Sequence, residues 1–264
     1  MRLAFFKQEY GVSCILFFHF QYIGSISLAP LLFPTLFYSF FCRKSWIYGI
    51  IFCMENKHYS FEDHTTWQRF FGHLRTVLRH KYYVACGCFR VGLYRQGLLH
   101  DLSKFSPTEF IPGVRFYDGH RSPNSIEREL FGCSKAWLHH KGRNKHHFEY
   151  WIDFSADPKE NVIGCKMPMR YVAEMICDRR AACMAYNGAA YTPSDPWKYY
   201  VRTRSRVIMS PDTRAVLEHA LLLLRDEGEP AAFAYVRRLL SVTKGTDYTA
   251  PSLGLAYVSL DQTP

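Results

Sequence analysis

Residues 98–104 read Leu98-Leu99-His100-Asp101-Leu102-Ser103-Lys104, and the interpretation of the chain starts from this stretch. A histidine and an aspartate are adjacent, an apolar run precedes them, and a lysine follows three residues after the aspartate. Eight of the twelve histidines lie between His73 and His147, so the pair sits in a histidine-dense block. Borderline divalent metals prefer imidazole and carboxylate ligands. The sequence therefore predicts a metal site centred on His100 and Asp101.

The composition indicates one folded domain in a reducing compartment. The chain has 264 residues, 48% of them hydrophobic, which is enough for one domain with a full core. Its net charge of +10 favours anionic partners such as phosphorylated small molecules, nucleic acid or an anionic membrane surface. Nine cysteines occur without a CxxC pair, which argues against a zinc ribbon or a disulfide framework. We expect free core thiols and a cytoplasmic protein.

Residues 1–53 differ in composition from the rest of the chain. No charged residue occurs between Glu9 and Arg43, and the stretch is rich in aromatic and aliphatic side chains. Three interpretations remain open: an upstream translation with Met54 as the natural start, a membrane or targeting segment, or a folded extension. The run is long enough for a membrane span, although two prolines interrupt it. We expect membrane contact or anchoring only if this segment belongs to the native protein.

From residue 54 the pattern is that of an ordinary helical protein, and no alternating strand pattern occurs. The sequence predicts an all-α domain over residues 54–241 and a flexible tail over 242–264. Asp63 is expected to cap the first helix, and Ser106-Pro107 and Ser210-Pro211 carry further helix-start signals. Residues 153–166 are expected to form a loop. Helices are predicted over residues 63–79, 82–96, 98–101, 107–112, 125–131, 134–140, 145–151, 168–186, 197–203, 211–224 and 230–240.

Two further residues fit a metal site. His80 precedes the pair on an earlier predicted helix, and Asp178 lies in the middle of the 168–186 helix. The neighbours of Asp178 include Ile176, Cys177 and Ala181, and a carboxylate in such apolar surroundings must be paired or metal-bound. A salt bridge from Asp178 to Arg179 or Arg180 is the structural alternative, and Glu174 is expected to be an ion-pairing or outer-shell residue.

This ordered set resembles a known signature. His80, then His100-Asp101, then Asp178 is similar to the H…HD…D pattern of the HD-domain superfamily of metal-dependent phosphohydrolases. Lys104 matches the HDxxK form of several branches, and residues 96–107 and 137–147 resemble an uncharacterised bacterial branch. The resemblance covers roughly residues 64–241. The chain departs from the family pattern in one respect, because His80 and His100 are closer in sequence than is usual there.

The resemblance implies an HD-domain-like helical bundle that binds one or two divalent ions, either Mn, Fe, Co, Ni or Zn, with Mg possible. It implies hydrolysis of a phosphate ester in a nucleotide or another small phosphorylated metabolite. Catalysis would use Asp101 and Lys104, and Lys141 and Arg143 would bind phosphate. The first ion would be held by His80, His100, Asp101 and Asp178. A second ion or the substrate would be bound by His139, His140, His146 and His147.

Two other functions remain open. An HD-like di-iron oxygenase is expected if the additional histidines bind a second, redox-active metal. A non-catalytic binding module that keeps its metal for stability is the other alternative. Separately, the structural alternative for the 139–147 block is a basic solvated turn. The net charge also permits nucleic-acid binding, but no recognised motif supports it. The sequence makes no prediction about oligomeric state.

Overall fold

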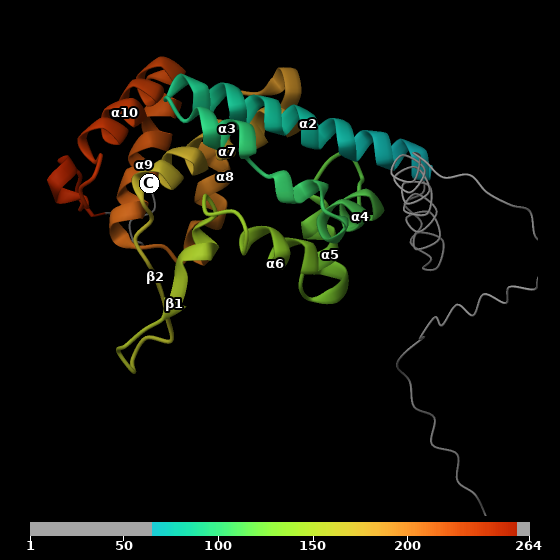
Figure 1. Ribbon diagram of the computed structural model, residues 1–264, viewed down its shortest axis with the longest axis horizontal. Helices are drawn as coiled ribbons and strands as arrows, with labels where there is room; N and C mark the ends of the chain where they lie inside the picture. Colours follow the sequence, from blue (N-terminus) through green and yellow to red (C-terminus); the bar gives the residue numbers. More distant parts are fainter. Residues whose placement is uncertain (1–64, 258–264) are drawn as a thin grey trace, which may run out of the picture. The chain divides into compact units, whose positions relative to one another are not determined.

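The computed structural model describes residues 65–257, and within this range the chain is mainly α-helical, as predicted (Figure 1). The expected cap Asp63, the apolar segment 1–53 and Met54 lie outside the described residues. The α-helices are α2 Thr66–Arg90, α3 Tyr94–Leu99, α4 Pro107–Arg115, α5 Pro123–Phe131, α6 Lys135–Lys141, α7 Met169–Asn187, α8 Asp195–Thr203, α9 Pro211–Asp226 and α10 Gly228–Val242. Short 3-10 helices cover Leu102–Phe105, Phe148–Trp151, Gly188–Ala190, Arg204–Arg206 and Pro251–Leu253.

Helix α2 is one continuous helix, so the predicted division into 63–79 and 82–96 is wrong. It begins after Thr65, whose side chain and that of Gln68 form a capping box. No proline or turn signal interrupts it near residue 81, and its buried face continues through Val77, His80 and Val84 at helical spacing. The continuity gives the site a rigid element that carries His80.

Helix α7 is the central helix of the core. It begins after Pro168 and ends before Gly188, as its start and stop signals predict. It packs along α2 and also contacts α9 and α10, so nearly every face of its middle turns is buried. The core around it includes Val84, Cys88, Val172, Ala173, Cys177, Leu217, Leu221 and Val236. An ionised side chain on the core-facing side of α7, such as that of Glu174, is therefore buried.

Helix α4 continues past the predicted stop at Pro112-Gly113 and ends at Arg115. The glycine has a packing role, because a Cβ there would lie 2.2 Å from Nε2 of the buried His73 on α2. Helix α4 thus approaches α2 closely at this point. The prediction failed because proline and glycine were treated as a stop signal, whereas the helix continues and its glycine leaves room for His73.

A short β-hairpin replaces part of the predicted 153–166 loop, so that prediction is wrong at two places. Strands β1 Ile152–Phe154 and β2 Val162–Gly164 pair antiparallel, with Ile152 opposite Gly164, and project from the helical body (Figure 1). Strands of three residues are too short to show alternation. The stretch predicted as helix over 145–151 contains the 3-10 helix Phe148–Trp151 rather than an α-helix.

The segment after α10 packs back on the core, although the sequence predicted a flexible tail from residue 242. Tyr248 is buried, and its hydroxyl donates to the carbonyl of Met167 at 2.7 Å. Ala250 is also fully buried.

Among the described helices, none combines the length and apolar character that a membrane crossing requires.

Candidate metal centre

The four residues predicted as ligands of one ion come together. His80 lies on α2, His100 and Asp101 follow α3, and Asp178 lies on α7; the four ligand atoms are all within 4.8 Å of one another. Nε2 of His80 is 3.0 Å from Oδ1 of Asp178, and Nε2 of His100 is 3.3 Å from Oδ2 of Asp101. We call these residues the first ligand group. The short sequence separation of His80 and His100 does not keep them apart, because α3 folds back along α2.

The His100-Asp101 pair lies in a turn, so the predicted helix over 98–101 is wrong. Helix α3 ends at Leu99, His100 is extended, and Asp101 has a left-handed backbone with φ of 52° and ψ of 31°. Asp101 is the one non-glycine residue with positive φ in the range 65–257. Consecutive helical residues point about 100° apart, whereas this turn brings both side chains to one point. Nζ of Lys81 holds the turn by donating to the carbonyls of Leu98 and His100.

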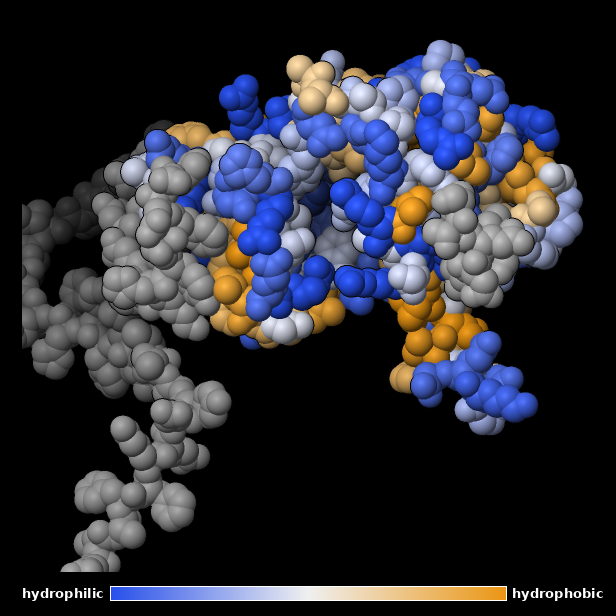
Figure 2. Space-filling model, turned by 180° about the vertical axis from the view of Figure 1, so that it is seen from behind, coloured by the Kyte–Doolittle hydropathy of each residue, from blue (hydrophilic) through white to orange (hydrophobic). Residues whose placement is uncertain are grey.

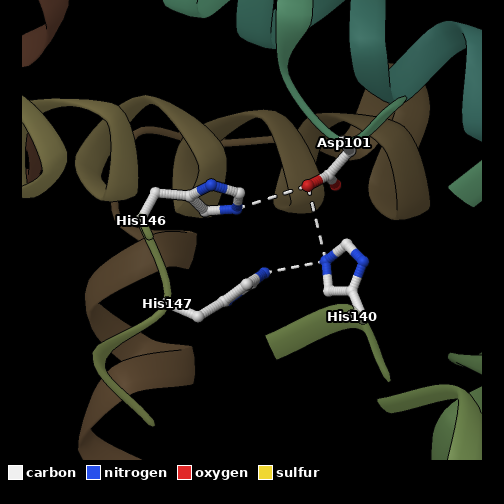
Figure 3. Close-up of side chains that lie close together, drawn as sticks. All are labelled: Asp101, His140, His146 and His147. Atoms are coloured by element: carbon white, nitrogen blue, oxygen red, sulfur yellow. Dashed lines mark hydrogen bonds and ion pairs between the residues drawn. The ribbon is translucent and has the colours of Figure 1, made fainter. Parts of the chain in front are cut away.

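A second ligand group shares Asp101. It consists of Asp101, His140, His146 and His147, which come from the turn after α3, the end of α6 and the following loop (Figure 3). Oδ1 of Asp101 lies 3.4 Å from Nε2 of both His140 and His146. The Nε2 atoms of His140 and His147 are 2.8 Å apart. Asp101 therefore presents one carboxylate oxygen to each group.

His139 is not brought into either group, in contrast to the prediction. Its Nδ1 lies 2.7 Å from Oε1 of Glu109 on α4. His139 and His140 are neighbours on α6, so their side chains leave the helix in different directions. His140 turns toward Asp101, and His139 stays beside Glu109.

Two buried glutamates contact the histidine rings on the side that faces away from Asp101. Oε1 of Glu174 lies 2.9 Å from Nδ1 of His100 and 3.3 Å from Nδ1 of His146, and Oε2 of Glu109 lies 2.7 Å from Nδ1 of His140. In each of these imidazoles, Nδ1 thus contacts a glutamate and Nε2 faces Asp101. Metal-binding histidines commonly have such a carboxylate on the second ring nitrogen, which fixes the tautomer and the ring orientation.

Sequence reasoning anticipated Glu174 but missed Glu109. The helix-start signal at Ser106-Pro107 gives Glu109 no role in the site. One signal was available: Glu109 lies beside Phe110 and one helical turn before Gly113, and all three are buried. A carboxylate on an apolar face requires a partner, and the histidine block was the obvious source of one.

Several buried polar atoms at this point have no hydrogen bond. They include Nε2 of His80, His100 and His146 and Oδ1 of Asp101, within the described chain. Carboxylate oxygens lie 3.0–3.4 Å from these nitrogens, but the angles are unsuitable for hydrogen bonds. An unsatisfied buried polar group costs about 1–3 kcal/mol. Donor atoms that converge without bonding one another are the arrangement that a cation would satisfy, and imidazole with carboxylate suits a divalent transition metal.

Two carboxylates and one imidazole of the centre have pKa values shifted toward the protonation states that a metal requires. Burial acts to raise the pKa of Asp101, but His100 and Lys104 hold it well below its usual value. The pKa of Asp178 is also well below its usual value, because the close approach of the His100 and His80 imidazoles outweighs burial. Burial, followed by the charge of Lys104, lowers the pKa of His80 to about 4. Ionised carboxylates and a neutral imidazole are the metal-binding forms of these groups.

The predicted phosphate-binding residues occupy different positions around the centre. Nζ of Lys104 lies 2.7 Å from Oδ2 of Asp101, and its side chain is 27% exposed. Lys141 is half-buried at the end of α6, and Arg143 is exposed and donates to the carbonyl of His139. The side chain of Asp178 is 16% exposed, so the first ligand group is reachable from solvent. Figure 2 shows a hollow with mostly hydrophilic surroundings on the face that it displays.

Comparison with known proteins gives one result of use. Residues 69–223 match a family of unknown function (DUF5662). No curated protein and no solved structure matches the chain. The matched region contains both ligand groups and the two glutamates behind them. Because the match covers more than half of the chain, the protein belongs to this family of unknown function, DUF5662.

Proposed function

We propose that this protein is a metal-dependent phosphohydrolase that acts on a nucleotide or another small phosphorylated metabolite. The observation that carries the proposal is the pair of buried ligand groups that share Asp101. Within the described residues, Nε2 of His80, His100 and His146 makes no hydrogen bond. The resemblance of His80, His100-Asp101 and Asp178 to the HD-domain signature supports the same function and suggests an HD-domain-like bundle.

In this proposal, the first ligand group holds one divalent ion and the second group holds another, with Asp101 common to both. Such ions lower the pKa of bound water and polarise a phosphoryl oxygen. Glu174 fixes the orientation of His100 and His146, so one carboxylate positions a ligand in each group. The ionised carboxylates and the neutral His80 are in their metal-binding forms. Burial acts to lower the pKa of His100, but Asp101 raises it well above its usual value, so His100 would release a proton on binding a metal.

Lys104 supplies the positive charge nearest to the shared carboxylate. Its ammonium group contacts Oδ2 of Asp101 and remains partly exposed, so it offsets the charge of Asp101 and can face an incoming phosphate. Arg143 and Lys141 add two cations at the end of α6, close in sequence to His140. Arginine binds phosphate through two parallel hydrogen bonds. We propose that these residues orient the phosphate group of the substrate.

The test combines metal analysis with a substrate panel. The full chain is loaded with Mn²⁺ or Co²⁺, and phosphate release from nucleotides and sugar phosphates is measured. We expect activity that falls to background in Asp101→Asn, while Asp153→Asn, an exposed carboxylate on β1, retains it. Unchanged metal content in both His100→Ala and Asp178→Ala would show that the site is wrongly assigned. Bound metal without phosphate release from any substrate would contradict the hydrolase.

A di-iron oxygenase is the second candidate, and one observation favours it. The second ligand group is rich in histidine and shares Asp101 with the first, so it could place a second redox-active ion beside the first. Purified protein with two irons and substrate-dependent oxygen uptake would select this function. If the protein retains its metal and gains thermal stability from it but shows neither reaction, it is a non-catalytic binding module.

A further inference from the structure

Helix α2 exposes a row of large apolar side chains along its outer face. Trp67, Phe71, Leu78 and Tyr82 each expose half or more of their surface. Their spacing of four, seven and four residues keeps them within a narrow strip of a helix that turns about 100° per residue. The opposite side of α2 packs against α7 in the core. The outer row is therefore additional to the core-facing side, and core packing does not account for it.

Helix α3 widens this row. Leu98 and Leu99 expose 61% and 50% of their surface. The bonds from Lys81 to the carbonyls of Leu98 and His100 hold the end of α3 beside the turn of α2 that carries Tyr82. We call the combined surface the apolar face; its members are Trp67, Phe71, Leu78, Tyr82, Leu98 and Leu99. Folded proteins seldom expose large contiguous apolar patches unless the patch binds a partner or a membrane.

In the segment that forms the apolar face, all charged residues are positive. Residues 66–100 contain six arginines and lysines and no aspartate or glutamate. Arg75 is exposed on α2 between Phe71 and Leu78, and Arg95 is exposed on α3. Arg90 pairs with Glu229 of α10 and is thus less available to a partner. Exposed aromatic and aliphatic side chains with arginine at their margin are typical of helices that lie on anionic bilayers.

We propose that the apolar face docks on an anionic membrane surface, with α2 and the end of α3 lying along the headgroup region. A second copy of the chain is a poorer occupant, because it would bring two basic margins and two chains of charge +10 together. An anionic bilayer complements both the apolar row and the arginines. The proposal does not depend on the phosphohydrolase assignment or on residues 1–64.

Vesicle sedimentation tests the proposal with the full chain. Vesicles of phosphatidylcholine with phosphatidylserine are compared with vesicles of phosphatidylcholine alone. We expect stronger binding to the anionic vesicles, a decrease on the order of tenfold in Leu78→Glu and in Tyr82→Glu, and about a fivefold decrease in Arg75→Gln. Val242→Glu, at a similarly exposed position on α10, is the matched control and should bind as the unmodified chain does. All variants keep residues 1–64, so binding through that segment would be equal in each.

Equal binding by Leu78→Glu, Tyr82→Glu and the unmodified chain would overturn the proposal, as would equal binding to neutral and anionic vesicles. Self-association that Leu78→Glu abolishes, without vesicle binding, would identify a second copy as the occupant and also overturn it. Quenching by brominated lipids gives a measurement that needs no charge substitution. We expect quenching of the unmodified chain to decrease in Trp67→Phe; an unchanged signal would place Trp67 away from the bilayer.

Discussion

Replacing Glu109 by glutamine separates the contributions of the two ligand groups. Oε2 of Glu109 contacts Nδ1 of His140, a member of the second group, and Oε1 contacts His139, which belongs to neither. Glutamine has nearly the same volume and keeps one carbonyl acceptor, so packing of α4 against α6 is retained. The substitution removes the negative charge that holds the His140 ring with Nε2 toward Asp101.

The expected magnitude follows from the contacts. Removing a carboxylate partner of a metal-binding histidine lowers metal affinity roughly 10- to 100-fold, which is about 1.4–2.8 kcal/mol. In Glu109→Gln this loss should be confined to the second group. Glu174→Gln should weaken both groups, because Oε1 of Glu174 contacts His100 at 2.9 Å and His146 at 3.3 Å.

Calorimetric titration of the metal-free chain with Co²⁺, together with elemental analysis, measures the two binding events. We expect two events in the unmodified chain, one weakened event in Glu109→Gln and two in Glu174→Gln. Glu218→Gln is the control, since Glu218 is equally buried but binds Tyr200 and Arg204. If Glu109→Gln weakens both events equally, or Glu174→Gln weakens only one, the division into two groups is wrong.

Three further predictions concern the fold around the site. Asp101→Asn and Asp101→Ala should both lose metal. In EDTA the alanine variant should be less stable than the asparagine variant by about 1 kcal/mol, because asparagine tolerates the left-handed backbone at this position better. Equal melting temperatures of the two variants would contradict this. Burial, then Lys104, lowers the pKa of His73 to about 4. As pH falls, His73 is protonated in the unfolded chain before it is in the folded one, so the free energy of unfolding decreases from pH 7 toward 4. In urea unfolding between pH 7 and 5, the metal-free chain should lose about 2 kcal/mol more of this free energy than the His73→Leu variant. Equal losses in the two proteins would refute the assignment. Gly113→Ala should destabilise the protein by about 1–3 kcal/mol, because the new Cβ meets the His73 ring; a stabilised variant would show that helix propensity outweighs the clash.

Local signals predicted several helix ends well. Ser210-Pro211 begins α9, Pro168 precedes α7 and Gly188 follows it, within a residue or two of the expected positions. Capping and stop residues act through neighbouring backbone groups, so the information is present in sequence. The strands of the hairpin are too short to show alternation, and the close packing of α4 on α2 depends on a residue far away in sequence. Gly113 faces His73 of α2, and no local pattern records that contact.

The candidate site was predictable to a similar degree. Asp178 could be selected because a carboxylate in apolar helical surroundings requires a partner. His100 and Asp101 stood out as an adjacent pair in a histidine-dense block, and the resemblance to the HD-domain pattern added His80. The structure brings the four together. The turn that reorients Asp101 could not be foreseen, since a helix through residues 98–101 satisfies the local pattern equally well. The contacts of His139 and His140 with Glu109 could not be foreseen either, because Glu109 approaches from another helix.

The ligand groups join segments that are far apart along the chain, from α2 through α6 to α7. Ions bound there would act as cross-links that the unfolded chain lacks. At a free metal concentration of 100 times the dissociation constant, each site adds about 2.7 kcal/mol to the free energy of unfolding. A shift of that size changes the unfolded fraction about a hundredfold. Metal supply in the cell would then determine how long each molecule escapes proteolysis, as well as whether its site is occupied.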